Sequence, residues 1–319
     1  MEKKLMSITA ALVVIILAAA TFAGLYLTNQ NQSTQSTQTT QAGSYQTSKI
    51  SVVAGENFWG SLISQLGGSR TQVLSIVTDP NADPHEYESN SQDAQAIANA
   101  AFVVINGAGY DDWALKLIAA SSTPHQVVLN VAELLGKKEG DNPHFWYSPY
   151  YVNDTVKAMY LDLISIDPAD ATYFTQQYAS LNVSLGVYNS RISEIRQQFA
   201  GAKVASTESI FVYLANATGL DVVSPPAFMN AVAEGNDPPA QSVVQFQDLI
   251  QNGTVAVLVY NAQTVTPLTQ NIKAMAAAKG IPIVAVTETI QPPDVSFQDW
   301  MNAELITLQN ALNAQALGH

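Results

Sequence analysis

The chain has 319 residues, of which 47% are hydrophobic and only 12% are charged, so it can bury the cores of two domains of ordinary size. Its 13 Lys and Arg residues against 26 Asp and Glu residues give a formal net charge of −13. This balance argues against nucleic acid as a partner, because nucleic-acid binding needs clustered basic side chains. The absence of cysteine excludes disulfides, thiolate metal ligands and a cysteine nucleophile.

The N-terminal segment, residues 1–27, is predicted to be a membrane anchor. Lys3 and Lys4 precede a long apolar run, SITAALVVIILAAATFAGLYL. A helix of about 21 apolar residues can cross ~30 Å of hydrocarbon. The two lysines favour an N-terminus in the cytoplasm, so we expect the rest of the chain to be extracytoplasmic and anchored to the cell membrane. A cleaved signal peptide is the alternative.

Residues 28–48 consist almost entirely of Ser, Thr, Gln and Asn. Such a segment has too little apolar surface to offset the entropy lost on ordering. We therefore expect a flexible, hydrated tether between the anchor and the folded body.

The body is predicted to be α/β, with two similar lobes at residues 49–166 and 202–319. In each lobe, short apolar runs alternate with helical patterns, which is the signature of βαβ units and a parallel sheet. Each lobe should therefore hold a roughly four-stranded parallel sheet flanked by helices. The apolar runs lie at 50–54 and near Val73, Val103, Val127, Val204, Val222, Val257 and Val284.

One long helix is predicted between the lobes, at residues 167–201. Asp167 suits the N-cap, Pro168 suits the first helical position, and Gly201 provides the stop. Apolar residues recur at steps of four and three from Phe174 to Phe199. We interpret this stripe as the core face of a rigid linking helix, with a coiled-coil dimer as the alternative.

Four side chains that suit a metal ion lie in loops of the two predicted lobes. His85 lies in NADPHEYESN and His144 in GDNPHFWYSPYYV, while Glu208 and Glu288 follow the apolar runs KVAST and PIVAV. In open α/β sheets, ligands bind in loops at the carboxyl ends of strands. Two neutral imidazoles and two carboxylates match the charge of one divalent ion and suit manganese or zinc. Taken singly, each residue is also compatible with a structural role.

Several nearby ionisable residues have more ordinary roles in this prediction. We expect His125 to be a surface residue that enters a strand, and His319 to be a free terminus. Asp83, Glu86 and Glu88 could support His85, although turn formation and solvation are the more usual roles for each of them.

Several motifs resemble the manganese- and zinc-binding solute receptors of ABC importers, the ZnuA/TroA-like family. The similar segments are VVAGENFWGSLISQLGG, DPHEYESNSQDAQAIANAAFVVINGAGYDDW, NPHFWYSP, STESIFVYLANATGLDVV and TETI followed by FQDWMNAELITLQNAL. They span roughly residues 50–312. The resemblance implies two lobes, a rigid linking helix and a closed metal site between the lobes, with His85, His144, Glu208 and Glu288 as ligands.

The chain also departs from the family pattern. The cysteine of the family's lipid anchor is missing, and Glu288 stands where aspartate is usual. No His- and Asp-rich loop lies between Trp113 and His144. This missing loop, together with a glutamate as the third ligand, favours manganese over zinc.

The resemblance predicts a monomeric, non-enzymatic solute-binding protein that takes up Mn²⁺ or Zn²⁺ and delivers it to ABC permease subunits in the membrane. A surface metallohydrolase is one alternative, although four ligands would fill the open position that catalytic zinc needs. A surface adhesin on the same fold and a receptor for an organic ligand are the others. Aromatic stretches such as FWYSPYY could line an organic pocket, but at this spacing they also suit a core.

Overall fold

The computed structural model describes residues 49–81, 84–121 and 123–317, and all of these belong to one compact unit. The predicted anchor and tether, residues 1–48, lie outside the described residues. No helix among the described residues is long and apolar enough to cross a membrane.

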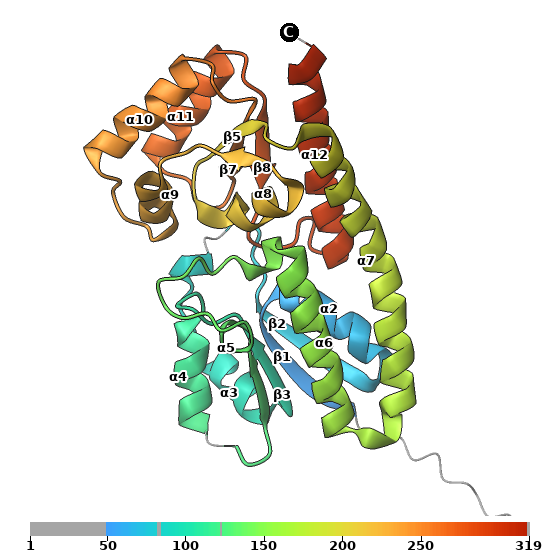
Figure 1. The fold of residues 1–319 in the computed structure, drawn as a ribbon. Coiled ribbons are helices and arrows are strands. Elements are labelled where there is room, and N and C mark those ends of the chain that lie inside the picture. The colour runs from blue at the N-terminus through green and yellow to red at the C-terminus, as the bar shows by residue number, and fades with distance from the viewer. Residues whose placement is uncertain (1–48, 82–83, 122, 318–319) are drawn as a thin grey trace, which may run out of the picture. The chain divides into compact units, whose positions relative to one another are not determined.

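The first lobe is built on a parallel sheet with strand order β2-β1-β3-β4 (Figure 1). Alternate residues of a strand point to opposite faces, so Val52 and Val104 pack on one side while Val53 and Val103 pack on the other. The strands are β1 (Ile50–Glu56), β2 (Thr71–Val77), β3 (Phe102–Ile105) and β4 (Val127–Asn130). The helices are α2 (Asn57–Gly67), α3 (Ser91–Asn99), α4 (Asp112–Ser121), α5 (Val131–Leu134) and α6 (Pro149–Ile166).

The second lobe repeats this arrangement with strand order β6-β5-β7-β8, again all parallel. The strands are β5 (Lys203–Ser206), β6 (Asp221–Val222), β7 (Val257–Asn261) and β8 (Ile283–Val286). The helices are α8 (Val212–Thr218), α9 (Pro226–Ala233), α10 (Ala240–Gln251), α11 (Pro267–Ala278) and α12 (Phe297–Leu317). The two four-stranded parallel sheets predicted from the sequence are therefore confirmed.

The long helix between the sheets is also confirmed, as α7 (Ala171–Phe199). Its 29 residues contact α2 and α6 of the first lobe and α8 and α12 of the second (Figure 1). The α-helix begins later than predicted, because Asp167 caps a separate 3₁₀ turn, Pro168–Asp170. The apolar stripe is buried within the chain, so it is core and not the seam of a coiled-coil dimer. Its buried members are Phe174, Leu181, Leu185, Tyr188, Ile192 and Ile195.

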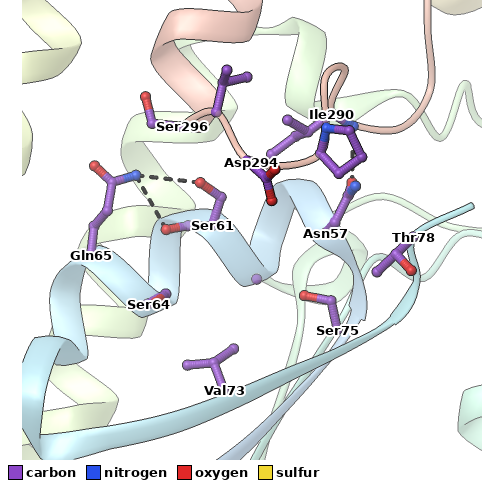
Figure 2. A pocket seen from close by; sticks show the side chains of 13 residues that line it. Asn57, Ser61, Ser64, Gln65, Val73, Ser75, Thr78, Ile290, Asp294 and Ser296 are labelled. Atoms are coloured by element: carbon purple, nitrogen blue, oxygen red, sulfur yellow. Dashed lines mark hydrogen bonds between the residues drawn. The ribbon is translucent and has the colours of Figure 1, made fainter. Parts of the chain in front are cut away.

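Polar contacts join helix α2 of the first lobe to the segment that precedes α12 in the second. The side chain of Asn57 accepts a hydrogen bond from the backbone of Ile290 at 3.0 Å, and Ser61 accepts one from the backbone of Phe297 at 3.0 Å. A cavity of about 450 Å³, here called the α2 cavity, lies beside these contacts (Figure 2). None of the four predicted ligands lines it.

Candidate metal centre

His85 reaches the space between the lobes from a short 3₁₀ turn, Pro84–Glu86, that follows β2. Its Nε2 atom lies 3.3 Å from Oε2 of Glu288, and its side chain is 22% exposed. The ring also packs edge-on against Tyr110, with the ring centroids 4.7 Å apart. His85 is thus the partly exposed member of the site.

His144 is fully buried, directly before the 3₁₀ turn Phe145–Tyr147. Asn142 fixes the orientation of this imidazole. The Nδ2 group of Asn142 donates to the carbonyl of Ser209 at 2.7 Å, so its Oδ1 atom must be the acceptor for the His144 backbone N–H at 3.0 Å and for Nδ1 at 2.7 Å. With the proton on Nδ1, the Nε2 atom carries a lone pair toward Glu288, 3.8 Å away.

Glu288 lies in the loop between β8 and α12, and several donors fix its position. Its backbone N–H donates to the side chain of Gln263 at 2.6 Å. Its Oε1 atom accepts hydrogen bonds from Asn261 at 2.7 Å and Thr264 at 3.2 Å. Its Oε2 atom accepts one from the hydroxyl group of Tyr110 at 2.8 Å and faces both histidines.

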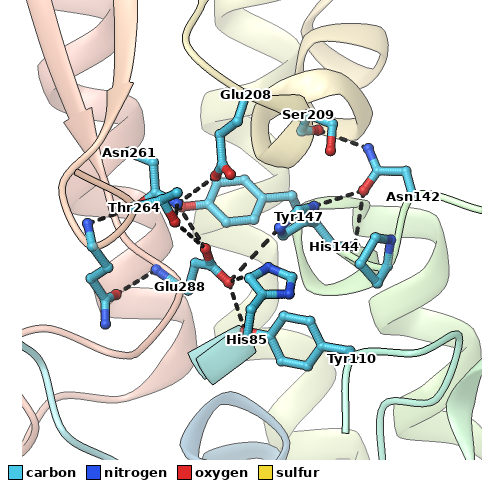
Figure 3. Close-up of polar contacts among 12 residues, drawn as sticks. His85, Tyr110, Asn142, His144, Tyr147, Glu208, Ser209, Asn261, Thr264 and Glu288 are labelled. Carbon is cyan, nitrogen blue, oxygen red and sulfur yellow. Dashed lines mark hydrogen bonds and ion pairs between the residues drawn. The ribbon is translucent and has the colours of Figure 1, made fainter. Parts of the chain in front are cut away.

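Glu208 is fully buried at the end of the loop that follows β5. The side-chain amide of Asn261, the last residue of β7, donates to Oε1 of Glu208 and also to Oε1 of Glu288. A single amide group therefore links the two carboxylates, as Figure 3 shows.

The structure brings three of the four predicted ligands into one group. His85, His144 and Glu288 each offer a ligand atom, and these atoms lie within 4.8 Å of one another. Two atoms that bind a tetrahedral ion at about 2.1 Å are about 3.4 Å apart, close to the observed 3.3 Å and 3.8 Å. Glu208 is not in this group and is connected to it through Asn261.

Burial and local charge set the protonation states of His144 and Glu288. Burial lowers the pKa of His144 to about 3, so this imidazole is neutral at physiological pH. Burial by itself would raise the pKa of Glu288, but the charge and hydrogen bond of His85, with contributions from His144 and Tyr110, hold it at about 2. A neutral imidazole lone pair and an ionised carboxylate thus face each other, an arrangement that a cation would stabilise.

A buried carboxyl group in α12 connects the loops that carry His144 and Glu288. The hydroxyl group of Tyr147 lies 2.9 Å from the carbonyl of Thr287 and 2.8 Å from Oε2 of Glu304, and the backbone of Thr287 donates to Oε1 of Glu304 at 3.0 Å. Burial raises the pKa of Glu304 to about 8. A protonated Glu304 can donate to Tyr147 while Tyr147 donates to Thr287, which satisfies every group.

A second buried acid supports the loop after β3. Asp111 accepts hydrogen bonds from the backbones of Asn106 at 2.6 Å and Gly107 at 2.7 Å. The side chain of Asn106 in turn donates to the carbonyl of Pro143 at 2.9 Å, directly before His144. Burial raises the pKa of Asp111 to about 6, and burial with the charge of Asp111 raises the pKa of the neighbouring Glu56 well above its ordinary value.

The remaining ionisable residues named from the sequence take no part in the described site. His125 is exposed and lies just before β4, as predicted. Glu86 and Glu88 are also exposed. Asp83 and His319 lie outside the described residues.

Several supporting residues are not apparent from the sequence, chiefly Tyr110, Asn142, Asn261 and Glu304. Asn261 has a signal that could have revealed it, because it is a polar residue that ends the buried apolar strand VLVYN. Asn142 lies two residues before His144 and contacts it locally, whereas Tyr110 and Glu304 contact the site only through the packing of distant segments.

Two like parallel sheets, a linking helix and a buried group of candidate metal ligands are features of two-lobed solute-binding proteins. The family model described as zinc-uptake complex component A, periplasmic, matches residues 52–311. The chain therefore belongs to this family, whose members are binding proteins and not enzymes.

The sequence identity to individual relatives is low. The chain is 26% identical over 184 residues to the manganese-binding lipoprotein MntA of Halalkalibacterium halodurans, which covers 54% of this chain and 59% of the relative. It is 23% identical over 157 residues to the zinc-binding protein TroA of Treponema pallidum, covering 47% and 51%. The matched parts thus span little more than half of these curated relatives.

Solved structures extend the likeness over the whole body. The solute-binding protein FpvC of Pseudomonas aeruginosa, solved in complex with Mn²⁺, superposes with a TM-score of 0.69 at 21% identity. The match covers 83% of this chain and 99% of that one. At this identity the likeness bears on the fold.

Proposed function

We propose that this protein is the extracytoplasmic solute-binding protein of an ABC importer and captures a divalent transition-metal ion. One observation carries the proposal: Nε2 of the neutral His144 and Oε2 of the ionised Glu288 face each other at 3.8 Å, with His85 beside them. A divalent cation among these atoms would replace the unfavourable approach of lone pairs with coordination bonds.

Glu208 completes the proposed ligand set. Its carboxylate is buried and hydrogen-bonded to the same amide of Asn261 that holds Glu288. On metal binding, Glu208 would exchange this hydrogen bond for a bond to the ion. His85, His144, Glu208 and Glu288 would then surround one ion with two imidazoles and two carboxylates, which balance its charge.

We favour Mn²⁺ as the physiological cargo, with Zn²⁺ next. A glutamate as third ligand, and the lack of a His- and Asp-rich loop between Trp113 and His144, support manganese. Relatives of the chain are named as binding proteins for manganese (MntA), zinc (TroA) and iron (YfeA of Yersinia pestis). Zinc outranks manganese in intrinsic affinity at N/O sites, so we expect Zn²⁺ also to bind tightly in vitro.

The proposed partners follow from the family. A monomer would hand the ion to ABC permease subunits in the membrane and release it when one lobe's ligands move. Residues 1–27 would anchor the protein to the cell membrane and residues 28–48 would tether the body outside. The lobes would comprise residues 49–166 and 202–319, with residues 167–201 as a stiff link that limits their motion.

Elemental analysis and competitive reloading with Mn²⁺ and Zn²⁺ test the proposal. We expect about one equivalent of metal in the wild-type protein and none in His144→Ala or Glu288→Gln, because each removes a ligand. His125→Ala is the matched control, since this exposed histidine lies outside the site. A metal-free wild-type protein after both loadings would contradict the proposal and favour the adhesin or organic-ligand alternatives.

A further inference from the structure

A cavity of about 590 Å³ opens beside the candidate metal centre, and we call it the α9 cavity. Two residues of the centre, His85 and Tyr110, line it, together with residues 139–143 of the first lobe and residues from α9 and the turn after it. His144, Glu208 and Glu288 are fully buried and do not line it. Of the four proposed ligands, only the partly exposed His85 reaches this cavity.

Three acidic residues line the α9 cavity and come from both lobes. Glu139 and Asp141 belong to the loop before His144, and Glu234 directly follows α9. Asp141 and Glu234 accept hydrogen bonds from neutral groups, the backbone N–H of Lys138 at 3.1 Å and the side chain of Asn236 at 3.2 Å. These hydrogen bonds leave the negative charges in place.

No lysine or arginine of the described chain lines the cavity. The nearby Lys137 has its Nζ atom over the ring of Tyr151, 5.5 Å from the ring centroid. The cavity therefore combines three carboxylates with a path to His85.

The α2 cavity offers a direct contrast. It includes one acidic residue, Asp294, but none of the four proposed ligands. The contact between Asn57 and Ile290 lines the α2 cavity, whereas an ion in the α9 cavity already meets His85.

We propose, resting on the metal-binding function above, that the α9 cavity is the entrance for the divalent cation. Glu139, Asp141 and Glu234 raise the rate of entry and do not coordinate the bound ion. A cleft lined by charge of one sign concentrates counter-ions and can raise association rates by about 10- to 1,000-fold. His85 is the first ligand that an arriving ion meets, and the buried ligands follow.

Stopped-flow mixing of the full chain with Mn²⁺ tests this proposal. Trp146 reports binding, because its ring centroid lies 5.3 Å from that of His144. We expect the triple variant Glu139→Gln, Asp141→Asn, Glu234→Gln to lower the association rate constant on the order of threefold to tenfold at low salt. The dissociation rate constant should stay within about twofold, because no ligand is lost. The difference should shrink near 1 M salt, where the Debye length is only ~3 Å.

A matched control removes the same charge elsewhere. Asp154→Asn, Asp248→Asn, Asp294→Asn changes the net charge equally but leaves the α9 cavity intact. We expect this control to bind Mn²⁺ nearly as fast as the wild type. An equal slowing by both triple variants, or no slowing by either, would overturn the proposal.

A single substitution provides a second test that does not depend on the triple variant folding. Asn230 lines the α9 cavity and is exposed, so Asn230→Lys adds a positive charge at the entrance and should slow association. Gln245→Lys, in a separate surface cavity, is its control. The equilibrium Mn²⁺ stoichiometry of the wild type reports on metal binding itself, whereas the ratio of association rates reports on the entrance. An unchanged association rate in Asn230→Lys, with normal stoichiometry, would overturn the proposal that the α9 cavity is the entrance and leave the proposed metal binding standing.

Discussion

The hydroxyl group of Tyr110 donates a 2.8 Å hydrogen bond to Oε2 of Glu288, so the first lobe holds a proposed ligand of the second. The same oxygen lies 3.3 Å from His85 and 3.8 Å from His144. Tyr110 therefore fixes the orientation of the carboxylate relative to both histidines, in the way that supporting residues orient metal ligands in other proteins.

Replacing Tyr110 by Phe should weaken metal binding by about tenfold without unfolding the protein, because it removes one orienting hydrogen bond and keeps the ring. Isothermal titration with Mn²⁺ or Zn²⁺ measures the change. Tyr87→Phe is the control, since Tyr87 donates to Asp93 at 2.8 Å, outside the ligand group. Equal affinities for Tyr110→Phe and the wild type would show that Tyr110 does not orient Glu288.

Removing the side-chain amide of Asn261 should destabilise the metal-free protein more than the metal-bound protein. Without this donor, two buried carboxylates lose a shared hydrogen-bond partner, a loss of about 1–3 kcal/mol. A bound divalent ion would replace the missing partner. Thermal unfolding of Asn261→Ala should therefore show a larger rise in Tm on metal addition than the wild type shows. The exposed Asn182→Ala serves as control, and equal rises in all three proteins would contradict this reasoning.

Glu304 should make stability fall as the pH rises. Its folded pKa of about 8 lies above the ordinary 4.5, so the folded state retains a proton that the unfolded state loses. The stabilising contribution is complete below about pH 4.5 and declines until about pH 8. Glu304→Gln mimics the protonated carboxyl group, so its stability should not share this decline. From pH 5 to pH 8, the unfolding free energy of Glu304→Gln should therefore rise relative to that of the wild type, on the order of 1–3 kcal/mol.

Chemical denaturation of Glu304→Gln and the wild type at several pH values measures this difference. The exposed Glu194→Gln, on helix α7, is the control. A difference that does not change between pH 5 and pH 8 would mean that Glu304 is ionised in the folded protein.

His144 should make the stability of the metal-free protein fall as the pH is lowered below about 6.5. Its folded pKa of about 3 lies below the ordinary 6.5, so the unfolded state binds a proton that the folded state excludes. The contribution of His144 is complete above about pH 6.5 and is lost progressively as the pH falls toward 3. Between pH 7 and pH 5, the unfolding free energy of the metal-free wild type should therefore fall relative to that of His144→Gln, on the order of 1–2 kcal/mol.

Denaturation in the presence of a chelator measures the effect of His144 without competition from metal. The carboxyl group of Glu288, with a folded pKa of about 2 and an ordinary value of 4.5, adds no slope above about pH 5. A wild type that matches His144→Gln at every pH would show that this imidazole is not excluded from protonation.

The fold was largely predictable because its signals are local. Short apolar runs such as FVVI at β3 and VLVYN at β7 are buried on both faces, and a parallel strand covered by helices requires such a run. The stripe on α7 predicted a buried face, although the start of the helix was placed too early because Asp167 and Pro168 also suit a 3₁₀ turn.

The candidate site was predictable only in part. Sequence position and family likeness selected His85, His144, Glu208 and Glu288. Each lies in a predicted loop of an α/β lobe, and ligands of open α/β sheets bind in loops at the carboxyl ends of strands. The sequence itself determined the two sheets, the linking helix and the chemical types of these side chains. Only the tertiary structure decided that Tyr110 holds Glu288, that Asn261 stands between two carboxylates, and that His85 is the one proposed ligand that lines the α9 cavity. The contacts of Tyr110 and Asn261 join residues between 27 and 178 positions apart, and such contacts are set by how distant segments pack and not by local propensity.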